Sequence, residues 1–180
     1  MDDRLAKALR TQGGIRRGLY SLPGVFMFGP MRRKDRELSS AEIEALLRDG
    51  EYGVLTVVGR NGFPHPIPMS YVYREGEIWL HGAKEGSKLD DIRADSRVSF
   101  CVVGQTEVLP EKFSTRYASV ILYGTAEEVP LDQAQPCLVA LLEKYSHDHM
   151  VKGLEYIQRA QDKTCVLRIL VQHMTGKARR

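Results

Sequence analysis

Short runs of β-forming residues, separated by turn residues, fill the middle of the chain and return near its end. Six strands are predicted, over residues 53–58, 63–73, 77–81, 97–103, 117–129 and 164–173. Asn61-Gly62 and Glu75-Gly76 supply the residue types that tight turns favour. Six strands with short connections predict a closed antiparallel barrel, and therefore a mainly β protein.

Apolar residues at helical spacing predict helices that flank this barrel. Ser39 and Glu42 form a capping box that starts one helix, and Gly50 lies where a left-handed C-terminal cap is expected. Further helices are predicted at residues 2–11, 132–145 and 148–160.

Three prolines alternate along the second predicted strand, at positions 64, 66 and 68. Proline has no backbone N–H, so one side of this strand cannot donate to a hydrogen-bond ladder. The strand is therefore predicted to lie at an edge of the sheet, or to face something other than a strand.

The apolar stretch 19–31 contains Pro23, Gly24, Gly29 and Pro30, which exclude a regular helix or strand through it. We expect an arm that covers either its own subunit or a partner subunit. The predicted organisation is an N-terminal helix and arm over residues 1–30, followed by the barrel domain over residues 31–180.

With 180 residues, 43% of them hydrophobic, the chain suits one compact domain. Its net charge of +3 comes largely from basic clusters near the two ends, which lack the interleaved aromatic residues and motif spacing of nucleic-acid readers. The three cysteines are far apart and form no CxxC pair, which argues against a disulfide framework or a zinc site. No apolar run is long enough to span a membrane. We expect a cytoplasmic protein that binds neither nucleic acid nor membrane.

The segment from His81 to Ile92 places a loop with glycine and lysine between a strand end and a helix start. Backbone N–H groups at a helix N-terminus point at a bound anion, and Lys84, Ser87 and Lys88 add two charges and a hydroxyl. This pattern indicates a seat for the phosphate of a cofactor. The alternative interpretation is an ordinary capped surface helix.

His81 closes an otherwise apolar strand directly before this loop. It is either a structural histidine at the barrel end or a group that donates a hydrogen bond to a cofactor or substrate.

His147 and His149 lie close in sequence but lack the further ligands of a metal site, so a surface pair is expected. No GxSxG motif supports a serine hydrolase.

Six segments together resemble the pyridoxamine 5'-phosphate oxidase-like flavoproteins, including their nitroimidazole-resistance branch. The segments are MRRKDREL, EYGVLTVVGRNGFPHPIPMSYVY, IWLHGAKEGSKLDDI, RVSFCVVG, EVLPEKFSTRYASVILYGTAEEV and HMTGKARR. The resemblance implies a split β-barrel that binds FMN at the interface of a homodimer, with residues of both subunits at each flavin.

The resemblance also implies which residues contact the flavin. Ser87 and Lys88 match the phosphate seat, to which Lys84 is adjacent, and His81 matches a histidine implicated in function. The other expected contacts are Pro66, Ile67, Pro68, Met69, Ser70, Tyr71, Gly82 and Ser119.

Three departures from the oxidases matter. These enzymes have arginine where this chain has Pro66, lysine where it has Tyr71, and an Arg-Lys pair where it has Ser87-Lys88. Oxidation of pyridoxine phosphate is therefore not expected.

The resemblance favours an FMN-dependent oxidoreductase that reduces nitroaromatic or other small electron-poor compounds. Without a GxGxxG motif, a donor such as NAD(P)H has to visit the flavin site. Three alternatives remain: a haem-handling protein with His81 or His173 as axial ligand, a flavin-binding scaffold without turnover, and a deazaflavin protein that uses Arg32, Arg33 and Lys177.

Overall fold

The computed structural model describes residues 28–180, so the predicted helix at 2–11 and most of the predicted arm lie outside the described residues. The strands are β1 (Gly53–Val58), β2 (Pro64–Met69), β3 (Tyr71–Arg74), β4 (Glu77–Ala83), β5 (Arg97–Val103), β6 (Glu107–Leu109), β7 (Ser114–Val129) and β8 (Thr164–Arg179). The helices are η1 (Lys34–Arg36), α2 (Ser40–Asp49), α3 (Ser87–Ala94), η2 (Pro110–Lys112), α4 (Leu131–Ser146), η3 (His147–His149), α5 (Met150–Ala160) and η4 (Gln161–Lys163).

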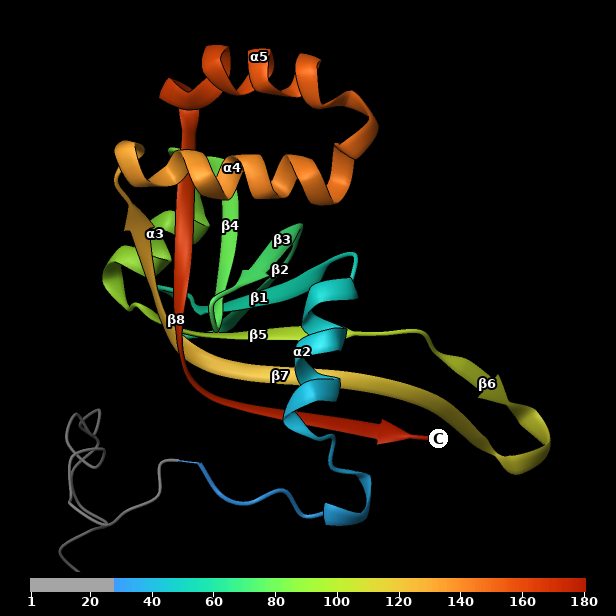
Figure 1. Cartoon of the computed structure of the whole chain (residues 1–180). Coiled ribbons are helices and arrows are strands. Elements are labelled where there is room, and N and C mark those ends of the chain that lie inside the picture. The colour runs from blue at the N-terminus through green and yellow to red at the C-terminus, as the bar shows by residue number, and fades with distance from the viewer. Residues whose placement is uncertain (1–27) are drawn as a thin grey trace, which may run out of the picture. The chain divides into compact units, whose positions relative to one another are not determined.

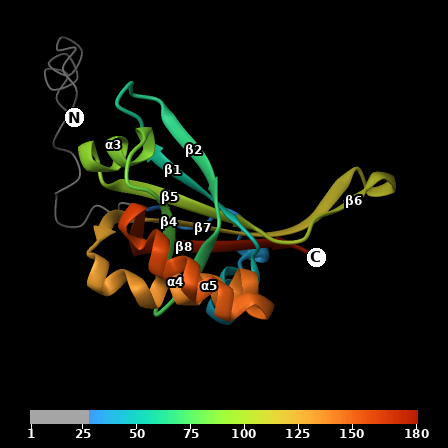
Figure 2. The same cartoon turned by 90° about the horizontal axis from the view of Figure 1, so that it is seen from above.

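All paired strands are antiparallel, and the sheet order is β2-β1-β5-β7-β8-β4-β3, with β6 paired only to β7. The two edge strands, β2 and β3, follow one another in the chain with only Ser70 between them. The sheet therefore curls until its two edges meet (Figures 1 and 2). This confirms the predicted split-barrel fold, although the second predicted strand breaks at Ser70 and β6 is additional.

Strands β7 and β8 are both longer than predicted, and they pair with each other from Tyr117 and Arg179 to Val129 and Val166. The register shifts between Tyr123 and Gly124, where an irregularity of the β-bulge type lets a long pair bend. A Cβ atom at Gly124 would overlap the backbone oxygen of Leu170, so this bend requires glycine.

The prediction for the proline-rich strand is confirmed, because in the described part of the chain β2 lies at an edge of the sheet and pairs only with β1. The prolines at 64, 66 and 68 face Val58, Thr56 and Val54 in the register. Since the three prolines share one parity along the strand, their missing N–H groups all lie on the side away from β1.

Helix α2 begins with the predicted capping box, in which the Ser39 hydroxyl accepts from the Glu42 N–H and the Glu42 carboxylate accepts from the Ser39 N–H. The predicted left-handed cap at Gly50 is wrong, because its φ of −62° and ψ of 133° are extended. A Cβ at Gly50 would lie 2.6 Å from Val102 and 2.7 Å from the Tyr71 hydroxyl. Close packing, not backbone conformation, explains this glycine.

Helices α4 and α5 form a hairpin over one end of the barrel (Figure 1). A second apolar cluster joins α4 to the sheet and includes Ala134, Cys137, Leu138, Leu141 and Val166. Helix α5 has no buried residue and meets α4 where Gly153 packs closely against Leu142. Among residues 28–180, no helix combines the length and the apolar character that a membrane span needs.

Candidate functional site

Helix α3 starts where the sequence placed the phosphate seat. Gly86 precedes it with a φ of 126°, a conformation that suits glycine, and no side chain caps the first turn. The buried Asp91 holds the helix in place, because its carboxylate accepts from the Arg60 N–H at 3.1 Å and pairs with His65 Nδ1 at 3.0 Å. The N–H groups of Leu89 and Asp90 donate to the Gly86 carbonyl, at 3.0 and 3.3 Å, which leaves the N–H groups of Ser87 and Lys88 for a ligand.

Lys88 lies over the end of β4. A Cβ atom at Gly82 would be 2.8 Å from Lys88 Nζ, so the glycine leaves room for the amine. The amine is 3.8 Å from Met69 Sδ, and within the described part of the chain no carboxylate lies within ion-pair distance of it. Partial burial lowers the pKa of Lys88. A half-buried cation without a counter-charge fits an anionic ligand.

The structure thus brings Met69, Gly82 and Lys88 together, although they come from two strands and a helix. Lys84 and Ser87 are exposed in the same loop and first helical turn. These residues together can hold a phosphate group.

His81 belongs to β4, opposite Val166 of β8, and its ring faces a pocket beneath the α4–α5 hairpin. Partial burial, and then the charge of Lys88, lower the pKa of His81. The imidazole is therefore neutral near pH 7 and can both donate and accept a hydrogen bond.

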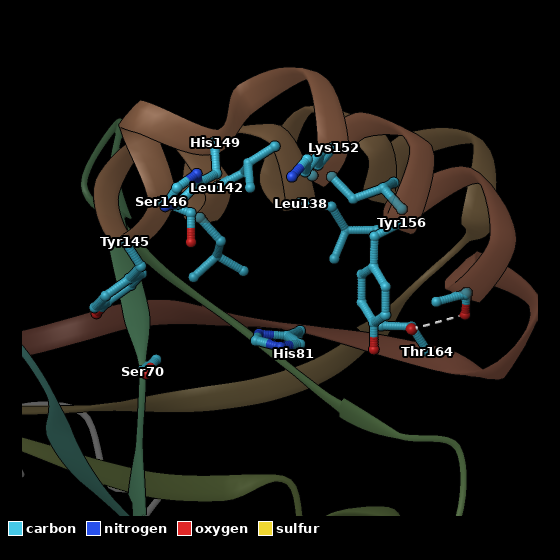
Figure 3. A pocket seen from close by; sticks show the side chains of 14 residues that line it. Ser70, His81, Leu138, Leu142, Tyr145, Ser146, His149, Lys152, Tyr156 and Thr164 are labelled. Carbon is cyan, nitrogen blue, oxygen red and sulfur yellow. Dashed lines mark hydrogen bonds between the residues drawn. The ribbon is translucent and has the colours of Figure 1, made fainter.

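The pocket has a volume of about 410 Å³, and Figure 3 shows His81 on its barrel side below the helices. Of the predicted flavin contacts, only Ser70 and His81 line it. The other lining residues are Leu138, Leu141, Leu142, Tyr145, Ser146, His149, Lys152, Gly153, Tyr156, Ile157, Ala160 and Thr164.

Tyr145 connects this hairpin to the barrel at the start of the edge strand β3. Its hydroxyl accepts from the Tyr71 N–H at 3.0 Å and lies within hydrogen-bond distance of the carbonyls of Glu51, at 2.7 Å, and Tyr71, at 3.0 Å. The Tyr71 side chain is fully buried, and its hydroxyl donates to the Leu47 carbonyl. The structure therefore does not present the Tyr71 side chain to a ligand.

The remaining predicted contacts are distributed along two other strands. Pro66 and Pro68 are exposed on the outer edge of β2, with Ile67 half-buried between them. Ser119 of β7 pairs with Lys177, whereas Gly82 pairs with Cys165, twelve residues away along β8. At the usual rise per residue this is on the order of 40 Å of strand. One subunit does not bring Ser119 to the Lys88 seat.

The sequence pattern of the pyridoxamine 5'-phosphate oxidase family matches residues 39–178. The chain belongs to the pyridoxamine 5'-phosphate oxidase family. This confirms the resemblance seen in its sequence. No curated protein matches the chain closely enough to add to this assignment.

Solved structures related to this family member share its fold. A conserved hypothetical protein, Rv2991, from Mycobacterium tuberculosis is 25% identical, with a TM-score of 0.72 over 83% of this chain and 90% of that one. A candidate 5-nitroimidazole antibiotic resistance protein from Bacteroides thetaiotaomicron is 20% identical, with a TM-score of 0.69 over 79% and 86%. An FAD and haem binding protein from Mycobacterium smegmatis is 19% identical, with a TM-score of 0.70 over 79% and 73%.

The sequence did not single out the helical half of the pocket. The spacing of Leu138, Leu141, Leu142 and Tyr145 predicts the helix but not the surface that it covers. His149 lines the pocket, although the sequence suggested only a surface pair with His147. Within residues 28–180, no group of three potential ligands is arranged to hold a metal ion.

Lys144 gives this family member an unusual buried amine. Its Nζ has no hydrogen-bond partner among residues 28–180 and lies 4.0 Å from the centre of the Tyr71 ring, and burial lowers its pKa to about 8. Between about pH 8 and pH 10.5, which is the ordinary pKa of a lysine, the unfolded chain binds more protons than the native chain. The free energy of unfolding therefore rises with pH in this range. We expect Lys144→Met to be more stable than the wild type at pH 7, by a margin that shrinks toward pH 9.5.

Urea unfolding of both proteins across this range measures the margin. The range ends at pH 9.5 because tyrosines in the unfolded chain ionise above it, while burial raises the pKa of Tyr71. A margin that does not change with pH would mean that Lys144 titrates normally in the native protein.

Proposed function

We propose that the protein is an FMN-dependent oxidoreductase that acts as a homodimer on nitroaromatic or other small electron-poor compounds. The main support is the half-buried Lys88 amine, which lies over Gly82 beside the N-terminus of α3. Within the described residues, no carboxylate pairs with this amine. This arrangement supports one phosphate group, which is what FMN carries.

Family membership and the related structures support a flavin. The Mycobacterium smegmatis protein, by its name, binds FAD and haem, and the Bacteroides protein is a candidate nitroimidazole resistance protein. A bound flavin would supply the hydride and electron transfer. The chain would hold its phosphate with Lys88, Ser87 and the first turn of α3, and would offer the neutral imidazole of His81 to the flavin or to a substrate.

The homodimer is supported by the position of Ser119. Since Ser119 of β7 lies opposite Lys177, far along β8 from the Cys165 that lies opposite Gly82, its predicted flavin contact requires a second copy of the chain. An electron donor such as NAD(P)H would have to reach the same flavin.

The absorbance spectrum of the purified full-length protein, before and after FMN is added and the excess removed, tests the proposal. Retained flavin bands are expected. Protein that retains no flavin would contradict the proposal, and a Soret band on haem addition that a substitution of His81 or His173 removes would favour the haem alternative.

We expect His81→Ala to retain FMN but to slow substrate reduction by about tenfold or more, because a positioned donor is lost from the pocket. The flavin is reduced with dithionite and mixed anaerobically with 4-nitroimidazole, and the rate of flavin reoxidation is followed. His147→Ala is the matched control, since His147 is exposed on η3 and does not line the pocket. Equal rates in the His81 variant and the wild type would exclude a role for His81.

A further inference from the structure

The pocket beneath the α4–α5 hairpin is distinct from the phosphate seat. Lys88, Gly82 and Met69 make the seat, and none of them lines the pocket. His81 and Gly82 are consecutive on β4, so they face opposite sides of the strand, His81 toward the pocket and Gly82 toward Lys88. A ligand in the pocket would therefore leave the seat free.

The pocket has the size and walls of a small-molecule site. Its volume of about 410 Å³ falls in the usual range for such sites, roughly 300–1,000 Å³. Leucines 138, 141 and 142 of α4 and Ile157 of α5 make an apolar lining, and Figure 3 shows the Tyr145 and Tyr156 rings on opposite sides of it. Such walls suit a flat apolar body.

Among the described residues that line the pocket there are one lysine, Lys152, and two histidines, His81 and His149. Lys152 and His149 lie at the helical roof and His81 lies at the barrel side, as Figure 3 shows. None of the lining residues is acidic. In the part of the chain that the structure describes, no carboxylate lies within ion-pair distance of Lys152. The roof therefore favours an anionic group at one end of the apolar body.

We propose that this pocket binds a planar aromatic monocarboxylate, with its ring between the leucines and tyrosines and its carboxylate at Lys152. The inference adds to the proposed function that the electron-poor aromatic substrate carries a carboxylate. Its meaning for catalysis rests on that proposed function. Binding itself depends only on the pocket.

Calorimetric titration of the flavin-free full-length protein with 2-naphthoate at pH 7.5 tests the binding. One molecule is expected to bind per chain, and the uncharged 2-naphthamide is expected to bind about tenfold more weakly, because it lacks the charge that pairs with Lys152. Lys152→Gln should weaken naphthoate binding by about the same factor and leave naphthamide binding unchanged. Lys163→Gln is the matched control, since Lys163 is exposed on η4 outside the pocket, and it should leave both affinities unchanged.

Three results would overturn the inference. These are no binding of naphthoate at millimolar concentration, equal naphthoate affinity in the Lys152 variant and the wild type, and strict competition between naphthoate and FMN, which would place the flavin itself in the pocket. The proposed function fails separately: protein that binds naphthoate but not FMN loses only the oxidoreductase, and protein that binds FMN but not naphthoate loses only this inference.

Discussion

Replacing Lys88 by alanine is expected to weaken FMN binding by roughly 30-fold, which corresponds to about 2 kcal/mol for a lost charge-assisted contact. The amine lies over Gly82 with no carboxylate partner in the described residues, so its charge is available to a phosphate. For the same reason, the substitution removes no ion pair from the folded protein. The free energy of unfolding without FMN should therefore change little.

Fluorescence titration of flavin-free protein with FMN measures this loss, and urea unfolding checks stability. Lys112→Ala is the matched control, because Lys112 is an exposed lysine of η2 that is distant in sequence from the seat. Unchanged FMN affinity in the Lys88 variant would remove the phosphate seat from the proposal. A large loss of stability would show that the lysine has a structural role instead.

Replacing Gly124 by alanine is expected to cost about 3 kcal/mol of stability, near the upper end of the usual range for overpacked sites. The added methyl group would overlap the backbone oxygen of Leu170, which cannot move aside as a flexible side chain would. The overlap lies at the register shift that lets the β7–β8 pair bend, so relief requires movement of a central strand.

The control for this substitution is Gly29→Ala, where an added methyl group meets no atom within 4 Å. Urea unfolding of both variants should show a large loss only at Gly124, with a change within about 0.5 kcal/mol at Gly29. Equal, small losses would mean that the bulge tolerates a side chain and that the bend has another cause.

Features that depend on neighbouring residues could be predicted from the sequence. The capping box of Ser39 and Glu42 needs only a few consecutive residues, and the alternating prolines of β2 determine its edge position by their missing donors. The order of strand, glycine and lysine loop, and helix also emerges as expected around Lys88.

Features that depend on distant packing could not be predicted in this way. Gly50 resembles a helix cap in sequence, but its neighbours Val102 and Tyr71 lie far along the chain and leave no space for a side chain. The break at Ser70 follows from closure of the barrel, which no local pattern encodes. Pairing with β7 extends β8 beyond its β-rich segment, and pairing with β6 extends the start of β7.

In the candidate site, too, one part depends on neighbouring residues and another part depends on distant packing. The predicted phosphate seat is a local motif, and the structure has the strand, loop and helix that the motif needs, in the expected order. The roof of the pocket depends on how α4 and α5 cover the barrel, so Tyr145 and Lys152 could be found only in the structure. The sequence could not show that Ser119 lies far from the phosphate seat or that the Tyr71 side chain is buried.

The alternating prolines of β2 also affect how this protein can associate with itself. An open edge strand normally offers donors and acceptors to a strand from another molecule, and can so start aggregation. The outer edge of β2 lacks the donors of residues 64, 66 and 68, so an incoming strand would find carbonyl groups without the matching N–H groups. Two copies that meet should therefore do so through the faces of their sheets, and not by continuing one sheet into the other at β2.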